Sequence, residues 1–306
     1  MSDHAHRHDA WTHGHMFLGH GHGHAERRTR AAAGITAAFM VVEIAAGLAF
    51  GSMALLADGV HMATHVGALG LAAGAYWLAR RHAQDTRFTF GSGKFGDLAA
   101  FTSAVILGLI GIGVAYESVT RLLAPVTVHY GEALPIAGVG LLVNIASAFV
   151  LHDPHHRDHA GHHDHNLRAA YVHVLADAAT SVLAILALAA GLFLGAAWLD
   201  PVVGLIGAGV IASWSYGLIR DSGLVLLDAE DDPQLARQIR TMIESEMNAR
   251  VSDLHLWRLG PGHRGLIVSL VSPDQTTATR IRDALRERHA DLSHVTVEIE
   301  LCADCP

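Results

Sequence analysis

The sequence has few cysteines and few charged residues, and both shortages exclude classes of protein. Of its 306 residues only Cys302 and Cys305 are cysteines, which excludes a disulfide framework of the secreted kind and predicts reduced, cytoplasmic thiols. Charged residues make up 16%, hydrophobic residues make up 51%, and the mean hydropathy is +0.31, too apolar for an ordinary soluble domain of this size. The net charge of −8 gives no sign of nucleic-acid binding. We therefore predict an integral membrane protein.

A signal peptide is also missing, and histidine is abundant instead. The first apolar run begins only after Arg27, Arg28 and Arg30, and a polar tail precedes it. The chain has 24 histidines, many of them in this tail (1–30) and in the segment 152–165. Their interleaved pattern is typical of a native segment and not of an expression tag. We expect both segments to hold metal loosely and to raise its concentration near the cytoplasmic mouth of the protein.

Six apolar stretches are long enough to cross a bilayer, whose ~30 Å core needs about 20 helical residues. They lie near residues 31–50, 53–79, 98–120, 134–151, 167–194 and 198–220. Basic residues concentrate on one side of the predicted membrane, so the positive-inside rule places both termini in the cytoplasm. The residues on that side are Arg27, Arg28, Arg30, Arg80, Arg81, Arg87, Lys94, Arg157, Arg168 and Arg220.

From about residue 221 the composition becomes that of a soluble domain. Asp232-Pro233 opens a helix to about Met247, strands follow near 251–259 and 264–271, and a helix at 276–290 and a strand at 294–301 complete the order αββαβ. We therefore divide the chain into a tail (1–30), a six-helix transmembrane domain (31–220) and a small α+β cytoplasmic domain (221–306).

Two short motifs in the apolar stretches carry metal-ligand residue types four apart, His61 with His65 and His173 with Asp177. Such residues stack on one helix face roughly 5–6 Å apart, so each pair can hold one ion. Counted along the predicted helices, His61 and His65 lie about 12 and 18 Å from the outer face, and His173 and Asp177 lie about 9 and 15 Å from the inner face. Both pairs therefore fall near the midplane, where they can form one four-ligand metal site.

Other polar residues lie in the same stretches. Asp58 lies three residues before His61. It either assists the site, as a partner of the metal ligands or as a proton acceptor, or it is an ordinary residue at the end of a helix. For Glu43, Glu117 and Asn144 we favour hydrogen bonds that pack the helices.

Two other functions of a helical histidine pair are disfavoured. A zinc protease needs His-Glu-x-x-His, but Met62 follows His61, so the catalytic glutamate is missing. Axial haem ligands face each other from different helices, and a carboxylate such as Asp177 is not a usual axial ligand. We therefore expect neither an enzyme nor a prosthetic group.

The chain resembles the cation diffusion facilitator family of divalent metal transporters. The matching segments, which span about 30 to 300, are 43–58, His61 onward, 116–125, Asn144, 166–181, Asp200-Pro201, 226–228 and 255–257. The resemblance implies six transmembrane helices, a cytoplasmic ferredoxin-like domain, a homodimer, a transport site on the second and fifth helices, and metal efflux driven by proton entry. We expect such a protein in the inner membrane of a two-membrane bacterium.

The sequence departs from the family's zinc pattern at one ligand, because the second helix usually supplies His-x-x-x-Asp and this chain has His65. Three nitrogens and one carboxylate disfavour manganese and suit cobalt, nickel, copper or zinc. With Phe90-Gly-Ser-Gly-Lys94 and the histidine-rich loop, the pattern resembles the cobalt- and nickel-exporting branch. A zinc or cadmium exporter is the alternative.

The soluble domain offers further metal ligands, and the chain has one non-transport interpretation. The candidate ligands are His255, His263, His294, Cys302 and Cys305. A membrane-anchored metal buffer or sensor would need the histidine-rich segments and could lose His61 or Asp177, whereas a transporter predicts the reverse. We favour transport, because buried ligand pairs have no purpose in a buffer.

Overall fold

The computed structural model describes residues 25–83, 85–151, 163–230, 232–247, 249–272 and 278–302. Inside the helices the side chains of 25–33, 36, 64–66, 68–69, 72–73, 147–151 and 163–177 are not described. The histidine-rich tail up to residue 24 and most of the histidine-rich loop therefore lie outside the described residues, as does Cys305.

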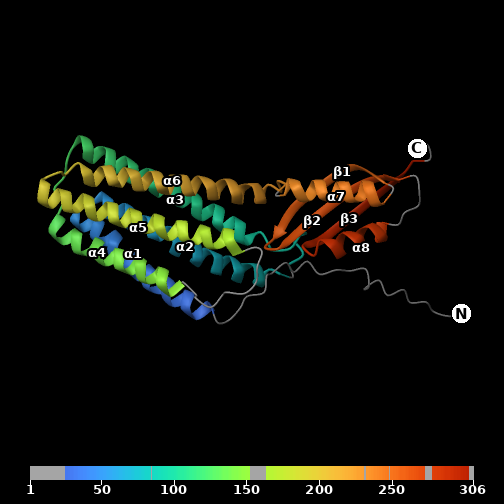
Figure 1. Ribbon diagram of the computed structural model, residues 1–306, viewed down its shortest axis with the longest axis horizontal. Helices are drawn as coiled ribbons and strands as arrows, with labels where there is room; N and C mark the ends of the chain where they lie inside the picture. The colour runs from blue at the N-terminus through green and yellow to red at the C-terminus, as the bar shows by residue number, and fades with distance from the viewer. Residues whose placement is uncertain are drawn as a thin grey trace. The chain divides into compact units, whose positions relative to one another are not determined.

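Six long helices form where the sequence predicts apolar helices (Figure 1). They are α1 (Ala25–Phe50), α2 (Met53–Arg81), α3 (Phe95–Leu123), α4 (Tyr130–Leu151), α5 (His163–Leu194) and α6 (Leu199–Leu226). Each helix includes its predicted apolar stretch, except that α6 begins one residue later than predicted, and most helices continue beyond the stretch into polar sequence. The six predicted helices are therefore confirmed as helices.

Membrane crossing is a separate property. By length and composition, α3 and α6 pass as membrane-spanning helices among the described residues. The other four contain shorter apolar segments, Ala37–Phe50, Met53–Ala63, Tyr130–Ala146 and Ala178–Leu194. Six crossings therefore stay a prediction.

The chain divides into two units, one formed by 21–73 and 100–220 and the other including 74–99 and 221–306. In the first unit, small buried residues pack the helices closely. Ala54 of α2 lies in one apolar cluster with Ala184 and Ala187 of α5, and Met53 and Ala57 lie in another with Ala208 and Ile211 of α6. Helix α2 therefore packs between α5 and α6.

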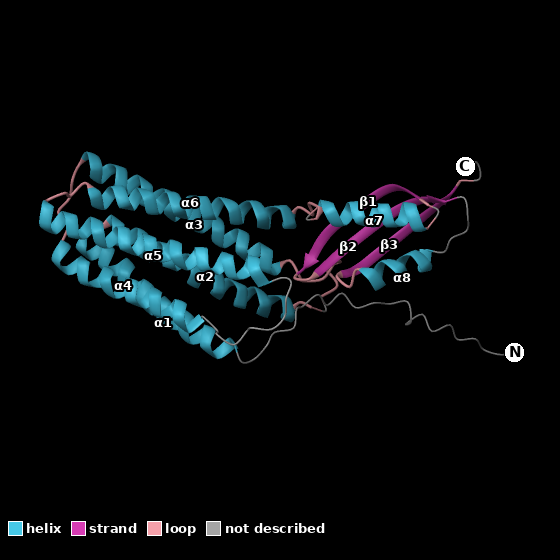
Figure 2. Cartoon of the chain, viewed as in Figure 1, coloured by secondary structure: helices cyan, strands magenta, loops and turns pink. Residues whose placement is uncertain are grey.

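The C-terminal part of the second unit is a sheet with two helices, as Figure 2 shows. Its elements are α7 (Pro233–Glu246), β1 (Arg250–Gly260), β2 (His263–Ser272), α8 (Ala278–Arg288) and β3 (Leu292–Leu301), which is the predicted order αββαβ. Strands β1 and β2 form an antiparallel hairpin, and β3 pairs parallel to β2 after the crossover through α8.

The core of this domain lies on one face of the sheet. Alternate residues of β2, namely Leu266, Val268 and Leu270, are fully buried in one cluster with Ile239 of α7 and Ile281 of α8. Both helices therefore cover the same face. A second cluster contains Trp257 and Leu259, which alternate along β1 with the core residue Leu256 and so lie on the opposite face.

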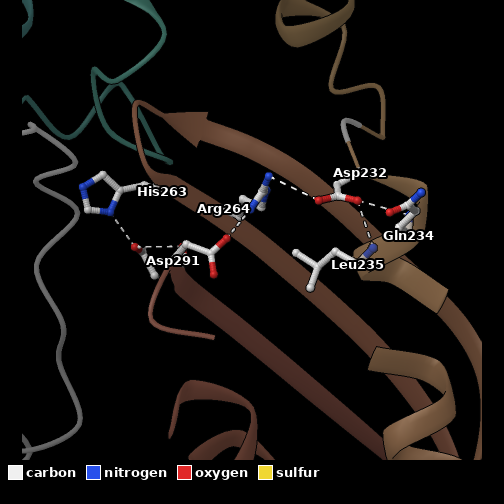
Figure 3. Close-up of polar contacts among 7 residues, drawn as sticks. Asp232, Gln234, Leu235, His263, Arg264 and Asp291 are labelled. Atoms are coloured by element: carbon white, nitrogen blue, oxygen red, sulfur yellow. Dashed lines mark hydrogen bonds and ion pairs between the residues drawn. The ribbon is translucent and has the colours of Figure 1, made fainter. Parts of the chain in front are cut away.

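Arg264 at the start of β2 joins the ends of two other elements (Figure 3). Its guanidinium forms an ion pair with Asp291 before β3 and lies 3.7 Å from Asp232 Oδ2. Asp232 in turn caps α7, because its Oδ1 accepts hydrogen bonds from the backbone N–H of Gln234 (3.1 Å) and Leu235 (2.9 Å). This network fixes the start of α7 to the β2–β3 end of the sheet.

Candidate metal-transport site

The first turn of α2 is held by a carboxylate from another helix. Asp200, in the first turn of α6, is only 1% exposed and accepts hydrogen bonds from Ser52 Oγ (2.5 Å) and from the backbone N–H of Met53 (2.7 Å) and Ala54 (3.3 Å). The first N–H groups of a helix have no partner within the helix, and an anion suits them. Asp200 therefore caps α2, the helix that carries His61, and fixes its start against α6.

Asp58 lies one turn further along α2 and is linked to two other helices. It is 2% exposed, and its Oδ2 accepts a hydrogen bond of 2.8 Å from Ser181 Oγ of α5. Ser181 Oγ accepts a hydrogen bond of 3.0 Å from Asn144 Nδ2 of α4. The prediction that Asn144 forms a packing hydrogen bond is thus confirmed, and the Asn144–Ser181–Asp58 chain joins α4, α5 and α2.

His61 is buried next to an aromatic residue of α6. It is 2% exposed, and its ring packs edge-on against Trp214, with 5.7 Å between ring centroids and an interplanar angle of 72°. A buried imidazole inside an apolar helix is costly unless it has polar partners or a metal.

The other three predicted transport ligands have described backbones only. His65 lies in α2, and His173 and Asp177 lie in α5, but their side chains are outside the described residues. Among the side chains that the structure does describe, no three His, Cys, Asp or Glu residues gather as a metal site. The four-ligand site therefore stays a prediction.

The remaining polar residues of the helices differ from one another. Glu117 pairs with Arg121 one turn later in the same helix at 3.0 Å, so the predicted hydrogen bond between helices is not found for Glu117 among the described residues, and Arg121 donates to the carbonyl of Gly51 in the α1–α2 turn. Glu43 of α1 is 0% exposed, and neither of its carboxylate oxygens has a hydrogen-bond partner among the described residues. For Glu43, the predicted packing hydrogen bond is therefore not found.

In the other unit, the segment between α2 and α3 contacts the sheet face opposite to α7 and α8. The Phe90 ring packs edge-on against Trp257 and His294, with 5.5 Å between centroids in both cases. Lys94 forms an ion pair with Asp228 just after α6. A Cβ at Gly93 would overlap the carbonyl oxygen of Leu259, so this close approach requires glycine. The Phe90–Lys94 motif is thus a docking segment for the sheet.

The candidate ligands of the C-terminal domain lie on different strands. His255 of β1 is exposed, with Nε2 2.7 Å from Asp253 Oδ2. His263 opens β2, with Nδ1 2.6 Å from Ser293 Oγ, and partial burial lowers its pKa (Figure 3). His294 of β3 lies opposite Gly265 and contacts Phe90. The structure does not bring these three histidines together.

Cys302 differs from the sequence prediction. It is disulfide-bonded, whereas the composition predicted a reduced thiol. In this oxidised form Cys302 offers no thiolate to a metal.

Sequence reasoning missed Asp200, Ser181 and Trp214 as neighbours of the site. Asp200-Pro201 and Ser181 lie in segments that match the family, which marks them for attention. Their partners are 146 to 148 and 123 residues away in sequence, and no periodic pattern points to such contacts.

Comparison with known proteins agrees with this architecture. The family model described as the cation efflux transmembrane domain matches residues 29–227. The cadmium, cobalt and zinc/H(+)-K(+) antiporter of Bacillus subtilis is 31% identical over 268 residues, covering 86% of this chain and 85% of that protein.

Two further relatives match over most of their length. The zinc transporter ZitB of Escherichia coli is 33% identical over 298 residues, covering 95% of this chain and 92% of that protein. The metal cation efflux system protein CzcD of Cupriavidus metallidurans is 31% identical over 283 residues, covering 90% and 87%.

A helical membrane domain with buried ionisable residues and a small C-terminal α/β domain define an integral membrane transporter and not an enzyme. More specifically, the chain belongs to the cation efflux family, the cation diffusion facilitators.

Proposed function

We propose that this protein exports divalent metal ions from the cytoplasm in exchange for protons, with His61, His65, His173 and Asp177 as the ligands of the transported ion. Family membership supports cation efflux, and the Bacillus subtilis relative is named an antiporter that uses protons.

The hydrogen bond between Ser181 and Asp58 carries the proposal, because it sets the relative level of α2 and α5. The two helices run antiparallel, since Ala54 clusters with Ala184 and Ala187 while Asp58 bonds Ser181. Position 61 lies three residues after Asp58 along α2, and position 177 lies four residues before Ser181 along α5. At 1.5 Å per residue, the rises along the two helix axes from the Asp58–Ser181 bond differ by about 1.5 Å.

The same count places the second pair. Four residues beyond position 61 is position 65, and four residues before position 177 is position 173, so positions 65 and 173 also share a level to about 1.5 Å. This register supports a single site in which α2 gives two ligands and α5 gives two.

The ligand types explain how protons and metal compete. A divalent ion binds neutral imidazole and ionised carboxylate, so protonation of His61, His65, His173 or Asp177 expels it. In our proposal the site binds metal when open to the cytoplasm, and protons displace the metal when it opens outward.

For ion choice we propose cobalt and nickel with zinc also carried. The two imidazoles of α2 replace the His-x-x-x-Asp of the zinc pattern, which removes one negative charge and favours nitrogen-seeking ions. The alternative is a zinc- or cadmium-selective exporter, because the relatives are named for zinc, cadmium and cobalt.

The same proposal includes the topology and assembly. It places six crossings in the inner membrane of a two-membrane bacterium, with both termini and the α7–β3 domain in the cytoplasm. It also includes a homodimer, and metal capture by the histidine-rich tail and loop.

The test of transport uses the purified full chain in liposomes. Cobalt, nickel and zinc flux is measured with and without a pH gradient, for the wild type, Asp177→Ala and the control Glu132→Gln, which changes an exposed residue of α4. We expect flux that the gradient drives, that Asp177→Ala abolishes and that the control retains. Metal binding without flux in the wild type would instead support the buffer or sensor.

The test of ion choice is His65→Asp in the same assay. We expect the ratio of cobalt to zinc flux to fall, because a carboxylate replaces an imidazole. An unchanged ratio would contradict the proposed cobalt and nickel preference and leave the zinc exporter.

A further inference from the structure

Glu43 is a buried carboxyl group outside the proposed ligand set. It lies in α1, is 0% exposed, and has no hydrogen-bond partner for either carboxylate oxygen among the described residues. An ionised carboxylate without partners is very costly in an apolar interior, whereas a protonated one is far less so. The surroundings of Glu43 therefore favour a bound proton in the metal-free protein.

The helices around Glu43 leave space for this carboxyl group. A Cβ at Gly140 of α4 would overlap Glu43 Oε1, so the absence of a side chain there makes room for the carboxylate. On α2, a Cβ at Gly59 would lie 3.0 Å from Glu43 Cβ. Glu43 is thus enclosed between α2 and α4, and α2 is the helix that carries His61.

Among the described side chains, the charged group that faces Glu43 is Asp58. It lies beside Gly59 on α2, and the two carboxyl groups are near enough to repel each other when both are ionised. The described titratable residues of α4 are Tyr130 and Glu132, which lie about two turns or more from Gly140. Two buried carboxyl groups of this kind cannot both be ionised cheaply without a nearby cation.

We propose that Glu43 holds one exchanged proton in addition to those taken up by the metal ligands, and that entry of a divalent ion next to Asp58 releases it. This inference rests on the proposed antiport function. The positive charge of the ion, bound one turn from Asp58 at His61, stabilises both carboxylates. The Glu43 O–H proton then leaves to water, and it returns from the opposite side of the membrane when the ion departs.

This arrangement gives the exchange a group separate from the metal ligands. Proton binding by the ligands alone makes metal and proton compete for the same atoms. A proton on Glu43 additionally couples the charge of the site to α1 and α4, two helices without proposed metal ligands. Loss of this proton should therefore weaken the coupling of transport to protons without removing the metal site.

The first experiment compares the wild type with Glu43→Gln in liposomes. The introduced amide mimics the protonated carboxyl in size but cannot release a proton, so the variant is expected to keep flux down a zinc gradient and to be stimulated less by a pH gradient, because only the protons of the metal ligands remain for exchange. Glu132→Gln, the same change at an exposed residue of α4, should keep both. Equal stimulation in Glu43→Gln and the wild type would overturn the proposal.

The design separates this proposal from the transport proposal. A wild type without pH-driven flux contradicts antiport itself, whereas a coupled wild type with an equally coupled Glu43→Gln contradicts only the role of Glu43. If Glu43→Gln does not fold, Glu43→Asp keeps a carboxyl group and should shift the pH at half-maximal flux. An unshifted pH profile in that folded variant would count against the proposal.

A second experiment needs no transport. Protons released when zinc binds are counted with a pH indicator in weakly buffered detergent, and we expect Glu43→Gln to release about one proton fewer per ion. The same count in both proteins would show that Glu43 does not lose its proton on metal binding.

Discussion

The α2–α5–α6 region and the C-terminal domain bury different kinds of residue. In the first, Asp58, His61, Ser181 and Asp200 are at most 2% exposed. In the second, the buried polar residue among those described is Ser272, and the ion pair Glu246–Arg288 has side chains about half exposed. Burial of ionisable groups is costly, so the difference agrees with the proposed transport role of the helices, whereas the charged residues of the domain follow the usual rule of exposure.

The two regions are also held together by different kinds of interaction. Apolar packing is non-directional, so the C-terminal core tolerates conservative changes. Buried hydrogen bonds such as Asp200 to Met53 N and Ser181 to Asp58 are directional, so they fix the register of α2 against its neighbours. Variants in the two regions should therefore separate stability from transport.

The largest effect on stability is expected from Ile239→Ala in α7. Ile239 is 0% exposed in the domain core, and removing its side chain should cost about 2–5 kcal/mol of the domain's stability. Thermal unfolding of the full chain in detergent measures this, with the exposed neighbour Gln238→Ala as control. Equal melting temperatures for Ile239→Ala and Gln238→Ala would contradict the assignment of Ile239 to the domain core.

Asp200→Asn should lower stability by about 1–3 kcal/mol and also reduce flux. Both carboxylate oxygens accept a hydrogen bond, so the amide nitrogen of asparagine would face a donor in either orientation. Asp221→Asn, at an exposed position of α6, is the matched control. Normal flux in Asp200→Asn would show that the cap of α2 does not position the transport site.

Ser181→Ala should weaken metal binding as well as lower stability. It removes the hydrogen bond from Asn144 and the one to Asp58, each worth about 0.5–1.5 kcal/mol, and loss of the bond to Asp58 should lower the apparent zinc affinity about two- to tenfold. Ser118→Ala removes an equally buried hydroxyl that has no hydrogen-bond partner among the described residues, and it should change little. The apparent zinc affinity is measured from zinc flux against zinc concentration. An equal change in apparent affinity for Ser181→Ala and Ser118→Ala would argue against the hydrogen-bonded link between α2 and α5.

The smallest effect is expected from Glu246→Gln. Arg288 bonds the carboxylate through two nitrogens at 2.8 and 2.7 Å and lowers the pKa of Glu246. A lowered pKa stabilises the fold at neutral pH, and this stabilisation is lost as pH falls below the ordinary glutamate value of about 4.3. The melting temperatures of wild type and variant should therefore differ slightly at pH 7 and converge in acid. A difference in melting temperature that grows in acid would contradict a stabilising ion pair between Glu246 and Arg288.

The sequence predicted the elements well, because they depend on local signals. Apolar runs located α1–α6, and Asp232-Pro233 located the start of α7. These signals repeat within a few residues of each other.

Contacts between distant residues could not be predicted in the same way. Asp200 capping α2, and Gly140 making room for Glu43, each join residues of different helices and leave no periodic trace. The oxidised state of Cys302 was predicted wrongly, because the count of cysteines indicates the compartment and not the state of one residue.

The central claim, one metal site shared by α2 and α5, is tested most directly by a double-mutant cycle on proton-driven zinc flux. His61→Gln, Asp177→Asn and the double variant are compared for apparent zinc affinity. If both residues bind the same ion, the double variant should be no weaker than the weaker single variant. Fold-losses that multiply in the double variant would show that the two residues act independently and would contradict the shared site.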